Sequence, residues 1–186
     1  TARSRGLGDV YKRQLPDYVP TDGLVGWWPL NGDAVDFSAS IADGTLNGPM
    51  ATIDRFGLES SALAFDGIDD WVSLGDLNPI SEGISEQASY SFWINVASFN
   101  SSDLQAFLIG DEINQNNGVI YQLATSHGFG AYVAGSTDWD GYCSCFPTLN
   151  EWHHVVFVQG EDGTDLYFDG QYLACLLYTS DAADDP

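Results

Sequence analysis

Short apolar runs bounded by Gly, Asn, Asp and Pro are the feature that most constrains how this 186-residue chain can fold. Residues 89–96 alternate, so that Tyr90, Phe92 and Ile94 share one face of an extended strand. No stretch keeps the 3.6-residue apolar period of a helix beyond about two turns. The pattern therefore predicts short strands at residues 24–30, 62–65, 71–74, 89–96, 104–109, 119–124, 129–134, 154–158 and 165–168.

Asp-Gly pairs predict turns between these strands. Asp169-Gly170 lies between apolar residues, which is a strong signal for a hairpin with a type I′ turn. Residues 65–71 have the same character with a longer loop. Many short strands joined by such turns indicate an all-β fold, an antiparallel two-sheet sandwich without an internal domain boundary.

The charge of the chain excludes two classes of partner. It has 27 Asp and Glu against 5 Lys and Arg, a formal net charge of −22. So few basic side chains cannot neutralise the phosphates of a nucleic acid, and they cannot bind an anionic membrane surface. No apolar run approaches the roughly 18–20 residues of a membrane span, so we expect no membrane insertion of this segment.

Both ends of the chain differ from its middle. The first fourteen residues hold four of the five basic side chains, Arg3, Arg5, Lys12 and Arg13. Residues 4–14 resemble the in-frame translation of a transposase-type sequencing adapter, and residues 175–184 resemble the complementary adapter read outwards. We therefore predict that residues 1–14 and 175–186 are adapter-derived and not biological. The alternative is a natural basic arm and a natural polar tail.

Residues 15–174 are then the expected domain. This segment keeps Arg55 as its one basic residue and contains no lysine. We expect it to be a fragment of a longer chain with neighbouring domains. The apolar residues 175–178 are able to extend the last hairpin as a strand without biological meaning.

Three motifs occur in order along this segment. The first is GLVGWWPLNGDAVD at residues 23–36, and the second lies between residues 54 and 72 and includes SALAFDGIDDWV. The third is NEWHHVV at residues 150–156, followed by LYFDG at residues 166–170. Together they resemble the laminin-G-like (LamG-like) jelly-roll family, within the concanavalin A-like lectin/glucanase superfold, over about residues 22–174.

The resemblance implies a concanavalin A-like jelly roll made of two antiparallel sheets. The family usually ends with further strands and an acidic segment, and the predicted adapter begins before them. We therefore expect the sandwich to lack its C-terminal closing strands, which would leave an unpaired sheet edge.

Two turns carry enough oxygen ligands to suggest calcium. Ca²⁺ prefers six to eight oxygens from carboxylates, Asn side chains and backbone carbonyls. The resemblance implies a structural Ca²⁺ near these turns in some members, although Asp and Asn are also ordinary turn formers. The expected ligands are Asn31, Asp33, Asp36, Asp69 and Asp70, and Asp66 lies in the same turn as the last two.

We predict no catalytic residues and no enzyme activity. The Glu-x-Asp-x-x-Glu spacing that glucanases of this fold carry is absent from the sequence. His153 and His154 are neighbours, so they cannot face one site on a regular strand, and the family resemblance makes them a structural signature. His127 lies in a predicted loop without a recognisable partner.

An irregular stretch before the third motif is suited to sugar. Aromatic rings stack on the C–H faces of a sugar, while carboxylates and amides bind its hydroxyls. The alternative is that the aromatic residues close one end of the sandwich. The expected ligand-binding residues are Asp138, Trp139, Asp140, Tyr142 and Phe146.

Cys143 and Cys145 are the two cysteines of residues 15–174. A bond between them closes a very small ring, so we expect two thiols or separate partners elsewhere. One Cys-x-Cys pair does not predict a zinc site.

The sequence thus predicts a non-catalytic carbohydrate-binding or adhesion module of a larger secreted or surface bacterial protein. Its partner would be a polysaccharide or a glycoprotein glycan. Dense carboxylates favour an extracellular, saline or calcium-containing setting, where they are screened or metal-bound. Two alternatives stay open: a structural or protein–protein interaction module, and a fragment of a glycoside hydrolase that lacks its catalytic residues.

Overall fold

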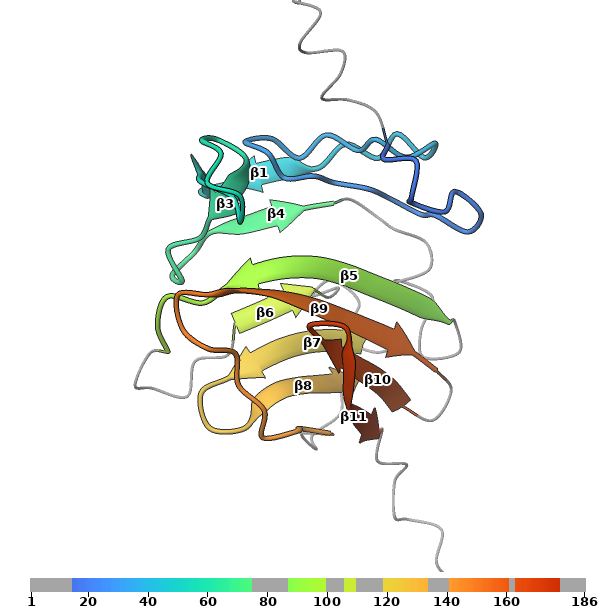
Figure 1. Cartoon of the computed structure of the whole chain (residues 1–186), viewed down its shortest axis with the longest axis vertical. Helices are drawn as coiled ribbons and strands as arrows, with labels where there is room; N and C mark the ends of the chain where they lie inside the picture. The colour runs from blue at the N-terminus through green and yellow to red at the C-terminus, as the bar shows by residue number, and fades with distance from the viewer. Residues whose placement is uncertain are drawn as a thin grey trace, which may run out of the picture. The chain divides into compact units, whose positions relative to one another are not determined.

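The computed structural model describes residues 15–74, 87–99, 106–109, 119–133, 141–160 and 163–177. Every regular element in these segments is a β-strand, which confirms the all-β prediction (Figure 1). The chain divides into two compact units, Thr1–Leu77 and Asn78–Pro186. None of the described residues forms a helix that is long and apolar enough to cross a membrane.

The first unit contains two small antiparallel sheets. Strand β1 (Thr45–Asn47) pairs with β4 (Trp71–Ser73), and β2 (Met50–Thr52) pairs with β3 (Ala62–Ala64). The predicted strands at residues 62–65 and 71–74 are present. Strands β1 and β2 were not predicted, because their sequences, TLN and MAT, each contain one β-branched residue and no aromatic residue.

The predicted strand at residues 24–30 is wrong, since this segment has no strand partner. Pro29 has no N–H to donate to a sheet, and Leu30 adopts a left-handed backbone with φ of 54°. The backbone groups of Trp27 are bonded locally instead. Its N–H donates to the Asp36 carboxylate at 2.8 Å, and its carbonyl accepts from the Phe37 N–H at 2.9 Å.

The second unit contains two larger antiparallel sheets. One has the strand order β11-β10-β9-β5, and the other has the order β6-β7-β8 (Figure 1). Most of these strands match the predicted ranges within a few residues. Their bounds are β5 (Ala88–Asn95), β6 (Ala106–Ile109), β7 (Val119–Ala124), β8 (Gly128–Val133), β9 (Trp152–Gln159), β10 (Gly163–Phe168) and β11 (Gln171–Leu177).

The apolar core lies between these two sheets. Strand β5 alternates in burial along its whole length, and Tyr90, Phe92 and Ile94 turn inward as predicted. Strand β9 alternates in the same way opposite β5, so that Val155 and Phe157 are fully buried. The other sheet contributes four buried side chains to the same core, Tyr121, Leu123, Phe129 and Ala131.

Tyr121 joins the two sheets through both its ring and its hydroxyl. The ring stacks on Phe157 with a centroid distance of 4.3 Å. The hydroxyl donates to Gln159 Oε1 at 3.2 Å and lies 3.3 Å from Thr164 Oγ1. Gln159 and Thr164 are buried and lie opposite each other on β9 and β10, so this contact satisfies polar groups inside the core.

The β10–β11 hairpin has the predicted turn. Asp169 and Gly170 have φ of 49° and 76°, which is the left-handed pair that a type I′ turn requires. The apolar tail does continue the hairpin, as expected, because β11 runs to Leu177 and Leu176 is buried in the core.

We predict that Tyr121→Phe destabilises the protein by about 1–3 kcal/mol, because it removes a hydroxyl that two buried polar side chains contact. Urea unfolding followed by tryptophan fluorescence measures the change. The matched control is Tyr18→Phe, since Tyr18 is 79% exposed and its hydroxyl should contribute less than about 0.5 kcal/mol. Equal effects of the two substitutions would contradict the role of the Tyr121 hydroxyl.

Candidate functional site

The predicted sugar-binding residues are not all together. Asp138, Trp139 and Asp140 lie outside the described residues. Tyr142 lies beside strand β8, whereas the Phe146 ring packs edge-on against Phe99 with a centroid distance of 5.8 Å. Phe99 itself packs on the core, so Phe146 closes an end of the sandwich and fits the alternative given above.

Residues 141–145, which we call the strap, run antiparallel to β8. The Cys143 N–H donates to the Phe129 carbonyl at 3.1 Å, and the Phe129 N–H donates to the Cys145 carbonyl at 3.2 Å. The Ala131 N–H donates to the Gly141 carbonyl at 3.2 Å. The strap therefore covers the free edge of the β6-β7-β8 sheet.

A disulfide within the strap joins Cys143 to Cys145. The expectation of two thiols or of separate partners is therefore wrong. Two residues apart in an extended chain, Cα atoms are separated by about 7 Å. Ser144 has φ of 51°, and this bend brings the two Cα atoms to 5.2 Å, within the usual range for a disulfide.

The Tyr142 ring lies on the outer face of the sheet above Gly130. A Cβ atom at Gly130 would collide with this ring, so only glycine leaves room for it. Gln122 lies opposite Gly130 in the β7–β8 register and is fully buried. Its Nε2 donates to Tyr142 Oη at 2.6 Å, and its Oε1 has no hydrogen-bond partner within the described part of the chain.

His127 completes this group from the β7–β8 turn. Its ring centroid lies 4.9 Å from that of Tyr142, and its Nδ1 lies 2.6 Å from the hydroxyl of Ser126. We call Ser126, His127, Tyr142 and the underlying Gln122 the Tyr142 group. Sequence patterns did not connect His127 with Tyr142, because the two residues lie 15 positions apart in the chain and on different predicted segments.

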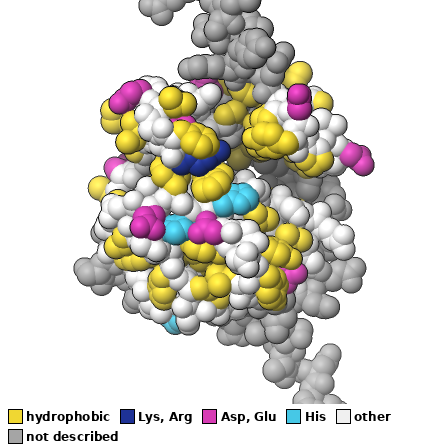
Figure 2. Space-filling view, viewed as in Figure 1, with side chains coloured by type: hydrophobic (Ala, Val, Ile, Leu, Met, Phe, Trp, Pro, Cys, Tyr) yellow, Lys and Arg dark blue, Asp and Glu magenta, His cyan; other side chains and the backbone are white. Residues whose placement is uncertain are grey.

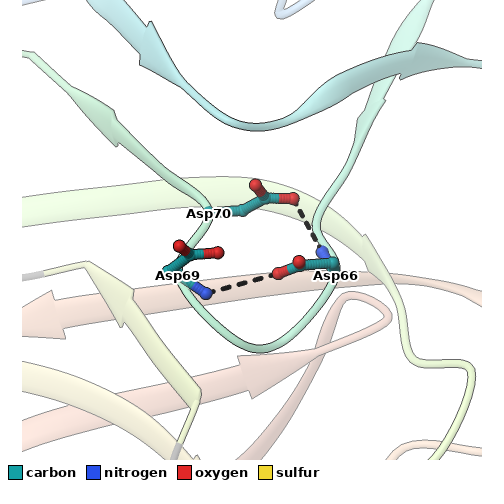
Figure 3. Close-up of side chains that lie close together, drawn as sticks. All are labelled: Asp66, Asp69 and Asp70. Atoms are coloured by element: carbon teal, nitrogen blue, oxygen red, sulfur yellow. Dashed lines mark hydrogen bonds between the residues drawn. The ribbon is translucent and has the colours of Figure 1, made fainter.

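A second cluster consists of the carboxylates of Asp66, Asp69 and Asp70 (Figure 3). One oxygen of each lies within 4.8 Å of the others, and the cluster occupies the turn between β3 and β4. Asp66 Oδ1 accepts from the Asp69 N–H at 3.3 Å, and Asp70 Oδ2 accepts from the Asp66 N–H at 2.8 Å. Asp69 and Asp70 were expected as ligands, and Asp66, in the same turn, was not among the expected ligands.

The other expected metal ligands lie in a different turn. Asn31 and Asp33 are half-buried, and Asp33 Oδ1 accepts from the Val35 N–H at 3.2 Å. Neither Asp33 nor Asp36 belongs to the carboxylate cluster around Asp66.

Asp36 is an internal hydrogen-bond acceptor. Its Oδ1 accepts from the Trp27 and Ser38 N–H groups, each at 2.8 Å. Its Oδ2 accepts from the Ser38 hydroxyl at 2.7 Å and the Ala42 N–H at 3.0 Å. Burial raises the pKa of Asp36, but these hydrogen bonds outweigh burial and hold that pKa below its usual value.

The two adjacent histidines face opposite sides of their sheet, as predicted. His153 is buried, and its Nδ1 lies 2.8 Å from Asp169 Oδ2. The Asp169 Oδ1 accepts from the His154 N–H at 2.9 Å. The bond from His153 is the largest of the effects that lower the pKa of Asp169, and it exceeds the opposing effect of burial. The pair therefore attaches the β10–β11 turn to β9.

The family model for the concanavalin A-like lectin/glucanases superfamily, Laminin_G_3, matches residues 66–182. This is more than half of the chain, and the protein belongs to this family. The match confirms the predicted resemblance, and it agrees with the two-sheet core of the second unit.

Among solved structures, the fold is similar to that of domain 4 of AbnA, a GH43 extracellular arabinanase from Geobacillus stearothermophilus, in complex with arabinotriose. The TM-score is 0.62 at 15% identity, over 83% of this chain and 75% of that chain. This likeness supports the fold alone. No curated protein matches the sequence.

We predict that Asp36→Asn destabilises the protein by about 2–4 kcal/mol at pH 7, because the new amide places hydrogens against two donors. Since the folded pKa of Asp36 is lowered, its contribution is complete above the unfolded value near 4 and is lost as the pH falls through the folded value. Urea unfolding at pH 7, 4 and 2.5 should therefore show the difference between the variant and the wild type shrinking with acid. A difference that grows with acid would contradict this role.

Proposed function

We propose that this domain is a non-catalytic module that binds neutral carbohydrate, within a larger secreted or surface bacterial protein. The observation that carries the proposal is the Tyr142 group. It combines an aromatic ring, an imidazole and a hydroxyl on the outer face of the β6-β7-β8 sheet.

This combination has the chemistry that a sugar requires. The tyrosine ring offers an apolar surface to the C–H groups of a pyranose or furanose ring. The imidazole of His127 can donate or accept a hydrogen bond with a sugar hydroxyl. Gln122 and Gly130 fix the tyrosine ring from below, so little side-chain entropy is lost on binding.

The charge of the protein narrows the class of sugar. The net charge is −22, and Arg55 is the one Lys or Arg among the described residues. Figure 2 shows acidic side chains at several places on the visible surface and basic colour at one. Such a surface repels sulfated and uronic glycans and favours neutral ones.

Linear arabinan fragments are suitable first probes. Domain 4 of the extracellular arabinanase described above was solved with arabinotriose, a neutral oligosaccharide. That arabinanase is extracellular, which also supports secretion of the protein to which the present domain belongs.

We predict that Tyr142→Ala weakens arabinotriose binding at the Tyr142 group about tenfold or more, because it removes the stacking ring. Tyr142→Phe keeps the ring and should change the Kd by less than about threefold. Phe146→Ala is the matched control, since this ring packs on Phe99 and should leave the Kd unchanged. Isothermal titration calorimetry measures all three. A larger loss with Phe146→Ala than with Tyr142→Ala would disprove the proposed location.

We also propose that Asp66, Asp69 and Asp70 hold a calcium ion that stabilises the β3–β4 turn. Three carboxylates this close repel one another, and a hard divalent cation relieves the repulsion. The Asp69 backbone N–H donates to Asp66, and neither carboxylate oxygen of Asp69 makes a hydrogen bond with the residues that the structure describes. Backbone carbonyls and water would have to supply the remaining ligands.

We predict that millimolar Ca²⁺ raises the melting temperature of the wild-type protein relative to chelator, because it binds the folded state. Asp69→Asn should reduce this shift. Asp43→Asn is a control, because Asp43 is an acid outside the cluster. An equal shift in wild type and Asp69→Asn would place the ion elsewhere, and an unchanged wild-type melting temperature would exclude it.

A further inference from the structure

A second aromatic and histidine pair lies on the four-stranded sheet. The Trp93 ring on β5 stacks on the His154 ring on β9, with a centroid distance of 5.1 Å and an interplanar angle of 27°. The hydroxyl of Ser91, also on β5, lies 2.8 Å from His154 Nε2. We call Ser91, Trp93 and His154 the Trp93 group.

This group lies on the outer face of its sheet. Its residues alternate along β5 with Phe92 and Ile94, which turn into the core. His154 likewise alternates with the buried Val155 on β9, and lies directly opposite Trp93 in the register. The tryptophan is 43% exposed, so its ring remains accessible to solvent.

The Tyr142 group and the Trp93 group contain the same types of side chain. In each, an aromatic ring lies about 5 Å from an imidazole, and a serine hydroxyl holds one imidazole nitrogen. In each, the other nitrogen makes no hydrogen bond with the described residues: Nδ1 of His154 and Nε2 of His127. A serine that fixes one nitrogen sets the tautomer and orientation of the ring, which leaves the second nitrogen ready for a ligand hydroxyl.

The two groups face in opposite directions. The Tyr142 group lies on the outer face of the β6-β7-β8 sheet, and the Trp93 group lies on the outer face of the sheet that contains β5 and β9. The core between the sheets is about 10 Å thick, and both groups project away from it. One short oligosaccharide therefore cannot contact both groups.

We propose that the Trp93 group is a second carbohydrate site and that the domain binds two separate neutral glycan chains. This inference rests on the proposed function, because the ligand chemistry is the same at both groups. Asp165 lies on the same outer face opposite Val158, and the Asp169 carboxylate accepts from the His154 N–H. These carboxylates favour neutral sugars at this site as well. With a site on each face, the domain can cross-link two polysaccharide chains.

Calorimetric titration with arabinotriose tests the number of sites. The wild type should bind two molecules per chain, and Trp93→Ala and Tyr142→Ala should each bind one. Trp93→Phe keeps an aromatic ring and should still bind two. Phe56→Ala is the matched control, because the Phe56 ring is 71% exposed and contacts Arg55 instead of a histidine, and this variant should also bind two. Circular dichroism and the melting temperature establish that each variant is folded.

Turbidity with soluble linear arabinan tests cross-linking by the same proteins. Wild type, Trp93→Phe and Phe56→Ala should produce turbidity, and both alanine variants should not. Binding of one molecule by the wild type, with Trp93→Ala unchanged, would overturn the second site and leave the proposed function standing. A wild-type protein that binds no arabinotriose and no arabinan would overturn both.

Discussion

The contact of Tyr121 with Phe157, Gln159 and Thr164 is the interaction on which the second unit depends. It is both an apolar stack and a hydrogen-bonded link between the two sheets. Residues from β7, β9 and β10 meet at this point, although they lie far apart in the sequence. By fixing how one sheet lies on the other, the contact also fixes which residues of each strand face outward. Both proposed sugar sites follow from that alternation.

In the first unit, the hydrogen bonds of one buried carboxylate supplement very short strands. Its strands have three residues each, so the sheet ladders supply few hydrogen bonds. The Asp36 carboxylate replaces part of a ladder by accepting four hydrogen bonds from the segments around Trp27, Ser38 and Ala42. A residue expected to bind a metal ion is therefore a structural centre of its own segment. The Asp36 carboxylate oxygens interact with N–H and O–H groups that carry partial positive charge, in the place where a metal ion was expected.

The strands of the second unit could be predicted because their alternation is long enough to identify the buried face, as in β5 and β9. The Asp169-Gly170 turn was equally predictable, since its conformation is local. The segment at residues 24–30 was not, because its apolar residues have the composition of a strand, while the backbone N–H of Trp27 donates to the Asp36 carboxylate nine residues further along the chain. The pairings of His127 with Tyr142 and of Trp93 with His154 depend on sheet register, which one sequence does not specify.

The disulfide of the strap acts on local geometry more than on the stability of the fold. A ring between Cys143 and Cys145 restricts the unfolded chain far less than a long loop would, for which the contribution is about 3 kcal/mol at 15 residues. Its effect is therefore local, on the bend at Ser144 and on the position of Tyr142 beside it. Reduction of the disulfide would thus act on the geometry of the proposed Tyr142 site, while the buried residues of the core between the two sheets include neither cysteine and would keep their packing.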